Sequence, residues 1–186
     1  KAYGITNIGK VRNINQDTFK TAALSENSGL VIVCDGMGGP GGGQIASSIA
    51  ADIILKSIKQ DFNDLLPEGK IKELIFSSVR AANTEVFKES MKSAELVGMG
   101  TTLVLALYVE DRVYVANIGD SRAYLFKDGI VSQITKDHSI VQDMLDSGKI
   151  SKFEAKNHPQ KNIITRALGV DITCEPDFFS IKADKK

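Results

Sequence analysis

The 186-residue chain contains no tryptophan, four prolines and two cysteines, and its 23 basic residues are balanced by 23 acidic ones. The lack of net charge argues against a dedicated nucleic-acid binder, because affinity for a phosphate backbone comes mostly from clustered lysine and arginine. No apolar run approaches the roughly 20 residues that a membrane-spanning helix needs. The longest apolar runs, such as residues 102–109, have the length of a strand. The sequence therefore predicts neither a nucleic-acid partner nor a membrane segment.

The two cysteines, Cys34 and Cys174, lie far apart, and neither belongs to a C-x-x-C pair. We interpret both as structural thiols of a reducing compartment, without a disulfide, which predicts a cytoplasmic protein. Hydrophobic residues make up 42% of the chain and charged residues 25%. These fractions are typical of a globular protein, and the length fits one domain with one core.

The order of hydrophobic patterns predicts an α+β fold. Short apolar runs with β-branched residues indicate strands, and apolar residues at helical spacing indicate two long helices between them. Asp128-Gly129 between two apolar runs predicts a tight hairpin, which favours antiparallel sheet. The polar stretch 149–161 is interpreted as a mobile surface segment. The expected strands are 30–34, 101–109, 112–118, 121–126 and 130–134, and the expected helices start near residues 44, 71 and 139.

The most unusual local feature is the stretch 35–43, in which six of nine residues are glycine. Glycine-rich loops at helix starts can bind phosphate through backbone N–H groups, but Gln44-Ile45 stands where a P-loop requires Lys-Ser/Thr. Asp35 follows a predicted buried strand, where a carboxylate is costly unless it is paired or bound to a cation. With the carbonyl of Gly36 beside it, Asp35 is a candidate ligand for a hard cation.

Two further clusters repeat parts of this chemistry. Asp120 follows a glycine at the end of the strand 112–118, although an aspartate turn with an Arg122 ion pair explains this pattern equally well. Asp17 and Arg12 lie in the polar stretch 9–17, which taken alone is an ordinary loop. Together, three aspartates at turns, an arginine and glycines fit a site in which divalent cations and a guanidinium hold a phosphate.

The remaining candidates predict structure rather than chemistry. His138 is interpreted as part of a helix start, with Asp137 or Ser139 as the cap. Residues 98–102 are interpreted as packing and turn geometry. Neither histidine of the chain pairs with cysteine at zinc spacing, and no G-x-S-x-G motif of a serine hydrolase is present.

The chain resembles the metal-dependent serine/threonine protein phosphatases of the protein phosphatase 2C type, in their compact bacterial form. The resemblance covers nearly the whole chain. It rests on blocks in a fixed order: TNIGKVR and NQD within 6–17, VCDGMGG at 33–39, GMGTT at 98–102, NIGDSRAY at 117–124, TKDHS at 135–139 and ITRALG at 164–169.

The resemblance implies a sandwich of two antiparallel sheets flanked by helices, with Mg²⁺ or Mn²⁺ at one edge. It implies that Asp35 bridges two main cations and that the Gly36 carbonyl binds one of them. Asp17 acts near the cations through water, Asp120 helps to hold a third, and Arg12 binds the substrate phosphate. The implied reaction is direct hydrolysis of phosphoserine or phosphothreonine by a metal-bridged water.

The resemblance also implies a domain plan. Residues 1–186 form a single catalytic domain, with 149–161 as a flap that influences substrate choice. Relatives continue with a strand ending in Ser-Asp-Gly and a later Asp-Asn pair, so we expect a domain that lacks its C-terminal strands and two ligands. Relatives also carry histidine where Pro40 stands and often a carboxylate where Gln44 stands.

Three functions follow from these observations. The first is a phosphatase that acts on phosphorylated proteins, opposes a serine/threonine kinase and works as a monomer. The second is a catalytically inert module of the same fold that binds phosphoproteins, because two expected ligands are missing. The third is a phosphate- or nucleotide-binding domain that uses the glycine-rich loop.

Overall fold

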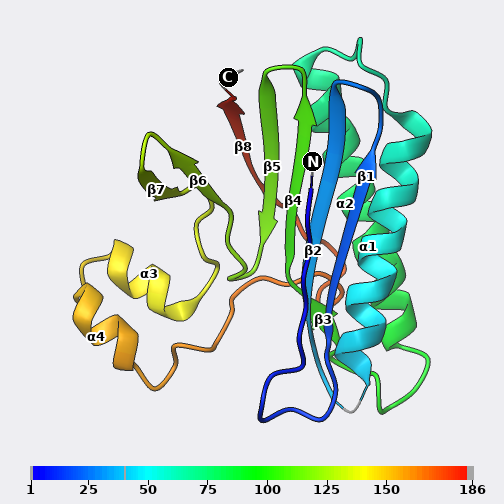
Figure 1. Ribbon diagram of the computed structural model, residues 1–186. Coiled ribbons are helices and arrows are strands. Elements are labelled where there is room, and N and C mark those ends of the chain that lie inside the picture. Colours follow the sequence, from blue (N-terminus) through cyan, green and yellow to red (C-terminus); the bar gives the residue numbers. More distant parts are fainter. Residues whose placement is uncertain (1, 40, 184–186) are drawn as a thin grey trace.

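A computed structural model describes residues 2–39 and 41–183 of the chain. Along the chain, two strands come first, two long helices follow, and the second half begins with further strands (Figure 1). The strands are β1 (Asp17–Ala23), β2 (Ser28–Met37), β3 (Gly100–Thr101), β4 (Leu103–Val109), β5 (Arg112–Ile118), β6 (Tyr124–Lys127), β7 (Ile130–Gln133) and β8 (Asp177–Lys182). The helices are α1 (Gly42–Asp61), α2 (Glu68–Ser90), α3 (Ile140–Asp146) and α4 (Lys152–Asn157).

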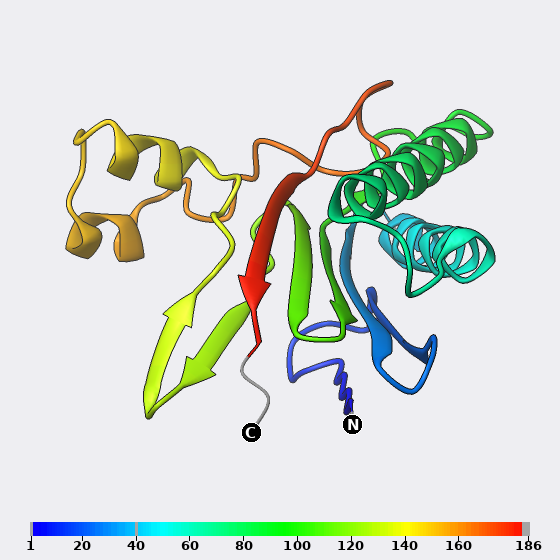
Figure 2. The same ribbon diagram turned by 90° about the horizontal axis from the view of Figure 1, so that it is seen from above.

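The main sheet has the order β1-β2-β4-β5-β8, with the short β3 paired to β2, and every pairing is antiparallel. A second, two-stranded sheet consists of β6 and β7. Helices α1 and α2 cover one face of the main sheet, and the β6–β7 hairpin stands on the side away from them (Figures 1 and 2). The predicted α+β fold with antiparallel sheets is confirmed.

The core lies between the main sheet and the two long helices. Successive side chains of a strand point to opposite faces. In β2 this alternation buries Leu30, Ile32 and Cys34 completely or almost completely, and it turns Val33 and Asp35 to the opposite face. Buried apolar side chains of both helices complete the cluster. The helices therefore cover the face that carries Cys34, and Asp35 points away from them.

The β6–β7 hairpin turns at Asp128 and Gly129, as predicted. Both residues have positive φ, 51° and 79°, which is the backbone of the tight turns that match strand twist. Three of its side chains, Phe126, Ile130 and Val131, are more than 60% exposed. The hairpin thus carries an exposed apolar surface.

Two elements of the structure were not predicted from the sequence. The polar stretch 149–161, interpreted as a mobile surface segment, contains helix α4. Ser151 and Glu154 form a reciprocal capping box there, which satisfies backbone N–H groups at the helix start. Strand β8, which the patterns did not predict, pairs with β5.

The remaining structural expectations concern cysteines and membrane segments. Cys34 and Cys174 are free thiols, and both are buried. Within the part of the chain that the structure describes, no helix is long and apolar enough to cross a membrane.

Candidate functional site

Four of the five predicted site residues line one cleft of about 540 Å³: Arg12, Asp35, Gly36 and Asp120. The fifth, Asp17, does not line it, but it stands directly opposite Asp35 in the β1–β2 register. Three separate segments of the chain therefore contribute to one site at the end of the main sheet. The rest of the cleft is formed by Gln16, Met37, Gly38, Thr102, Asn162 and Ile164.

Asp35 is the electrostatic centre of the cleft. Partial burial raises the pKa of its carboxyl, and the negative charges of Asp17 and Asp120 and a hydrogen bond with Asp17 raise it further. Only the guanidinium of Arg12 acts in the opposite direction. The side chain is nevertheless exposed, because strand alternation points it away from the core. Asp35 is therefore not the buried carboxylate that its position after an apolar strand suggested.

Two glycines of the 35–43 stretch, Gly36 and Gly43, are required by close packing of backbone. A side chain on Gly36 would collide with the backbone of Gly43, and one on Gly43 would collide with Gly36. The N–H of Gly36 donates to the carbonyl of Gln16 at 3.1 Å. The start of α1 therefore lies directly against the end of β2, beside the point where Asp17 begins β1.

Thr102 fixes the backbone of Asp35. The N–H of Asp35 donates to the Thr102 hydroxyl at 3.0 Å, and the N–H of Thr102 donates to the Asp35 carbonyl at 2.9 Å. The same hydroxyl lies 2.7 Å from that of Ser121, next to Asp120. Residues 98–102 were interpreted as packing and turn geometry, and the sequence analysis did not anticipate this hydrogen-bonded link.

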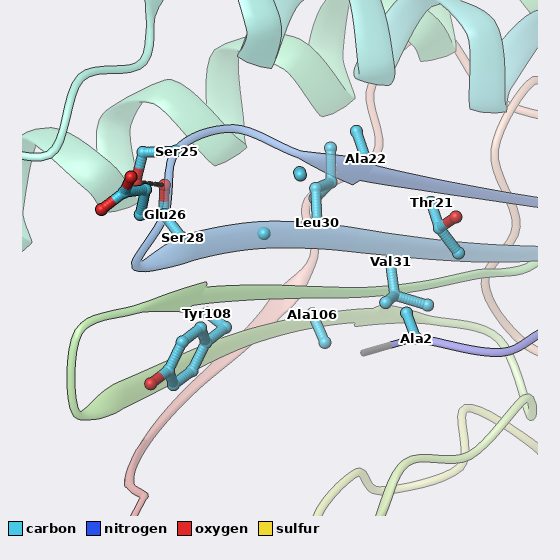
Figure 3. A pocket seen from close by; sticks show the side chains of 12 residues that line it. Ala2, Thr21, Ala22, Ser25, Glu26, Ser28, Leu30, Val31, Ala106 and Tyr108 are labelled. Carbon is cyan, nitrogen blue, oxygen red and sulfur yellow. Dashed lines mark hydrogen bonds between the residues drawn. The ribbon is translucent and has the colours of Figure 1, made fainter.

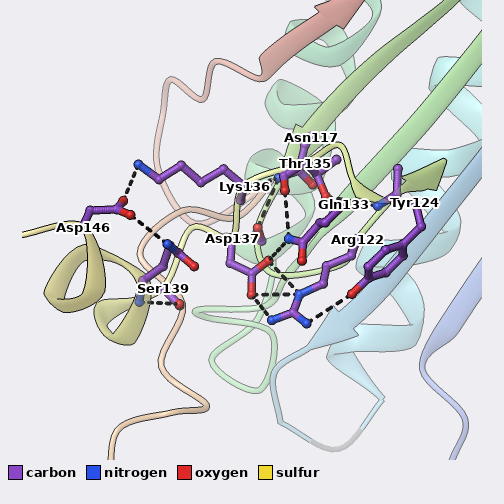
Figure 4. A network of polar contacts seen from close by, with 12 residues as sticks. Asn117, Arg122, Tyr124, Gln133, Thr135, Lys136, Asp137, Ser139 and Asp146 are labelled. Carbon is purple, nitrogen blue, oxygen red and sulfur yellow. Dashed lines mark hydrogen bonds and ion pairs between the residues drawn. The ribbon is translucent and has the colours of Figure 1, made fainter. Parts of the chain in front are cut away.

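The turn before Asp120 is formed by Gly119, whose φ of 92° favours glycine. A Cβ there would lie 2.7 Å from Cγ2 of Thr102, so the turn is also closely packed. Arg122, two residues later, binds Asp137 through hydrogen bonds of 2.6 to 3.0 Å, which raise the pKa of its guanidinium (Figure 4). The suggested Arg122 ion pair therefore exists, and its partner lies in another segment.

His138 follows Asp137 and precedes α3. The predicted helix cap is confirmed for Ser139, whose hydroxyl accepts from the N–H of Gln142 at 3.2 Å. His138 itself is buried and contacts Gly119. The sequence analysis did not anticipate this contact, because nothing in the local pattern connects residues 19 positions apart.

The fit of the site to divalent cations can be assessed from its donors. Carboxylates of Asp35 and Asp17 and the carbonyl of Gly36 are hard oxygen ligands, which Mg²⁺ and Mn²⁺ prefer. A cation would also relieve the repulsion that raises the pKa of Asp35. Among residues 2–39 and 41–183, however, no three Asp, Glu, His or Cys side chains form a group that could hold a metal ion. The donor chemistry fits, and the described residues supply part of a ligand set.

At two positions near the start of α1, Pro40 and Gln44, this sequence differs from the pattern expected of its relatives. Gln44 is exposed on the first turn of α1. Pro40, the position where relatives carry histidine, lies outside the described residues.

A larger hollow of about 680 Å³ lies away from this cleft, on the open face of the main sheet (Figure 3). Thr21, Val31, Ala106 and Tyr108 line it, and Glu26 is the one charged side chain among its described lining residues. Those described residues include none of the predicted site residues.

Comparison with known proteins identifies relatives over most of the chain. The sequence model of the family described as protein phosphatase 2C matches residues 10–165. The serine/threonine phosphatase stp of Listeria monocytogenes is 39% identical over 176 residues, which cover 95% of this chain and 69% of the relative.

Solved structures agree with this result. The serine/threonine phosphatase Stp1 of Staphylococcus aureus superimposes with a TM-score of 0.87 at 36% identity, covering 96% of this chain and 69% of that one. The catalytic domain of the phosphatase PstP, solved in complex with two manganese ions, gives a TM-score of 0.78 at 34% identity. That match covers 95% of this chain and 69% of the other.

Proposed function

Because this chain belongs to the protein phosphatase 2C family, we propose that it hydrolyses phosphoserine and phosphothreonine in proteins with the help of Mg²⁺ or Mn²⁺. The observation that carries the proposal is the cleft itself. It places the Arg12 guanidinium beside the carboxylates of Asp35 and Asp120, in a site lined mainly by polar atoms. Such a site can hold cations and a phosphate dianion together.

Each side chain has a distinct role in this proposal. Asp35 and the carbonyl of Gly36 would hold the two main cations, and Asp17 would act on them from the facing strand. Arg12, exposed at the mouth of the cleft, would bind the phosphate oxygens through its planar guanidinium. Divalent cations in such sites activate water and offset the negative charge of the phosphoryl group.

Asp120 and the segment 149–161 have the more peripheral roles. Asp120 would help to hold a third cation, since it lies close enough to Asp35 to raise the pKa of that carboxyl. The segment 149–161 would act as a flap that influences substrate choice. Its helix α4 contacts α3 and buries none of its side chains, which supports a surface role.

We propose that the substrates are the products of a serine/threonine kinase and that the chain acts as a monomer in the cytoplasm. The two free, buried thiols support a reducing compartment. The domain assignment over residues 1–186 is likewise a proposal, supported by one core shared by the main sheet and both long helices.

The second candidate function is an inert module of the same fold that binds phosphoproteins. The absence of a three-ligand metal group among residues 2–39 and 41–183 favours it. The third function, a nucleotide-binding domain, has less support, because close backbone packing accounts for glycines 36 and 43 of the loop.

The deciding experiment measures Mn²⁺-dependent hydrolysis of a phosphothreonine peptide by the chain and by Asp35→Ala. We expect activity in the wild type and its loss in the variant, whereas Asp64→Ala, an exposed aspartate outside the cleft, should retain it. Activity that persists in Asp35→Ala contradicts the metal mechanism. A wild type that binds the peptide without cleaving it supports the inert module, and nucleotide binding without metal supports the third function.

A further inference from the structure

We propose that His138 is a positioning residue for Asp120, holding the turn that presents this carboxylate to the cleft. The inference rests on the proposed function only in giving Asp120 a task in the cleft. The observations that carry it concern the backbone on either side of the preceding glycine, Gly119, and a chain of polar contacts behind the histidine ring.

His138 binds both peptide units that flank the Cα of Gly119. The N–H of Gly119 donates to Nδ1 of the imidazole at 3.1 Å, and the N–H of His138 donates to the Gly119 carbonyl at 2.9 Å. The Nδ2 group of Asn117 also faces that carbonyl, at 3.4 Å. His138 is 6% exposed, so water does not replace these bonds readily.

The opposite edge of the ring faces a carboxylate. Since Nδ1 accepts a hydrogen bond, the ring proton of a neutral histidine resides on Nε2. Nε2 lies 3.2 Å from Oδ2 of Asp177 in β8, and Asp177 in turn accepts a 2.8 Å hydrogen bond from Arg166. The contact between Nε2 and Asp177 does not have the geometry of a hydrogen bond, so the Gly119 N–H alone assigns the tautomer, and Asp177 only faces the other edge of the ring.

Residues that precede His138 in the chain bind the residues that follow Asp120. Arg122 binds the carboxylate of Asp137, and the N–H of Ala123 donates to the Thr135 hydroxyl at 3.0 Å (Figure 4). Residues before and after Asp120 are thus tied to one segment, 135–138. Asp120 itself is the point of the turn between these attachments.

The turn has little freedom to adapt if this contact is lost. Gly119 adopts a φ of 92°, and Thr102 packs against the place where a Cβ would stand. Without the imidazole, the buried Gly119 N–H would lack its acceptor, a cost that favours reorientation of the Ile118–Gly119 peptide unit, one residue before Asp120. A displacement of about 1 Å in a group that positions a reacting phosphate can strongly reduce turnover.

Two variants separate the two edges of the ring. In His138→Asn the amide oxygen can occupy the place of Nδ1 and accept from Gly119, but nothing reaches Asp177. In His138→Gln the amide reaches the place of Nε2, and the acceptor for Gly119 is lost. Lys136→Ala is the matched control, because it removes a surface ion pair with Asp146 from the same segment.

The first measurement is hydrogen exchange of the Gly119 amide by NMR. We expect about tenfold faster exchange in His138→Gln, and values near the wild type in His138→Asn and Lys136→Ala. The ring ¹⁵N signals of the wild type provide a test that requires no variant: Nδ1 should be unprotonated. A protonated Nδ1, or equal exchange in the Asn and Gln variants, would overturn the proposal.

The second measurement is calorimetric Mn²⁺ titration. The binding event that is lost in Asp120→Ala is assigned to the cation held by Asp120. We expect His138→Gln to weaken this event about tenfold while His138→Asn retains it. An unchanged event in His138→Gln contradicts the positioning role. A wild type without phosphatase activity refutes the proposed function. A wild type without an Asp120-dependent binding event refutes the metal role of Asp120. The exchange data then decide on His138 independently.

Discussion

The hydroxyl groups of Thr102 and Ser121 lie 2.7 Å apart, and this contact connects Thr102, which is bonded to the backbone of Asp35, with the residue that follows Asp120. Thr102 also accepts from the Asp35 N–H at 3.0 Å, so its oxygen is shared between both sides of the cleft. The separation of the two carboxylates is therefore set by a neutral side chain that is itself almost completely buried.

Replacement of this hydroxyl should damage both stability and function. Thr102→Val keeps the shape of the side chain but leaves the Asp35 N–H without its acceptor, at a cost of about 1–3 kcal/mol in the free energy of unfolding. Urea denaturation measures this cost, and phosphopeptide hydrolysis should fall with it. Thr102→Ser, which retains the oxygen, is the control, and an equal loss in both variants would contradict the role of the hydroxyl.

Arg12 offers a test of phosphate binding that is separate from folding. Its side chain is exposed, so Arg12→Ala should leave the unfolding transition unchanged. The KM for a phosphothreonine peptide should rise by about tenfold or more, because a charge-assisted, two-point contact is lost. Arg12→Lys should recover only part of the loss, since an ammonium group cannot bind two oxygens in one plane. An unchanged KM would remove Arg12 from the site.

Asp120→Ala should lower turnover more than it lowers occupancy of the two main cations. The reason is that Asp120 comes from a separate turn after β5, whereas Asp35 and Asp17 face each other across two paired strands. Calorimetric Mn²⁺ titration alongside steady-state kinetics measures both quantities. Loss of both main binding events in this variant would refute the division of roles.

The lowered pKa of Asp177 predicts that the free energy of unfolding depends on pH. Partial burial raises the pKa of its carboxyl, but polar contacts and charge from Arg166 and His138 outweigh that effect, and the pKa lies below its ordinary value. Its contribution to stability is thus fully present above the unfolded value of about 3.9 and is lost as pH falls through the lower folded value.

The measurement is urea denaturation of the wild type and Asp177→Asn between neutral and acidic pH. The difference in their free energies of unfolding should shrink as the solution becomes more acidic than the unfolded pKa. A difference that stays constant over this range would show that Asp177 does not titrate as its contacts require.

Much of the site was predictable because it depends on local sequence. A strand at residues 30–34 follows from their apolar run, although the structure extends β2 through Asp35 to Met37, and the β6–β7 turn follows from Asp128-Gly129. The family resemblance, which rests on the order of the motifs, assigned Arg12, Asp17 and Asp120 to the same site. Four of the five predicted site residues line one cleft.

The missed features depend on contacts between distant segments or on weak local signals. Thr102 and His138 act on residues 67 and 19 positions away, respectively, and only the assembled sheet brings them there. Helix α4 was missed because it buries no side chain and so has no apolar periodicity. Its capping box, Ser151 with Glu154, was the available signal.

The mutual contact of Gly36 and Gly43 has a consequence for variation in this chain. Neither position can accept even a methyl group without moving β2 against α1. Because each glycine already lacks a side chain, a substitution at one of them cannot be compensated by a smaller residue at the other. In a library randomised at both positions and selected for folding, we expect double glycine to be the main survivor. The spacing between the Asp35 backbone and α1 is therefore fixed by the absence of side chains, and it would persist even where the surrounding loop sequence drifts.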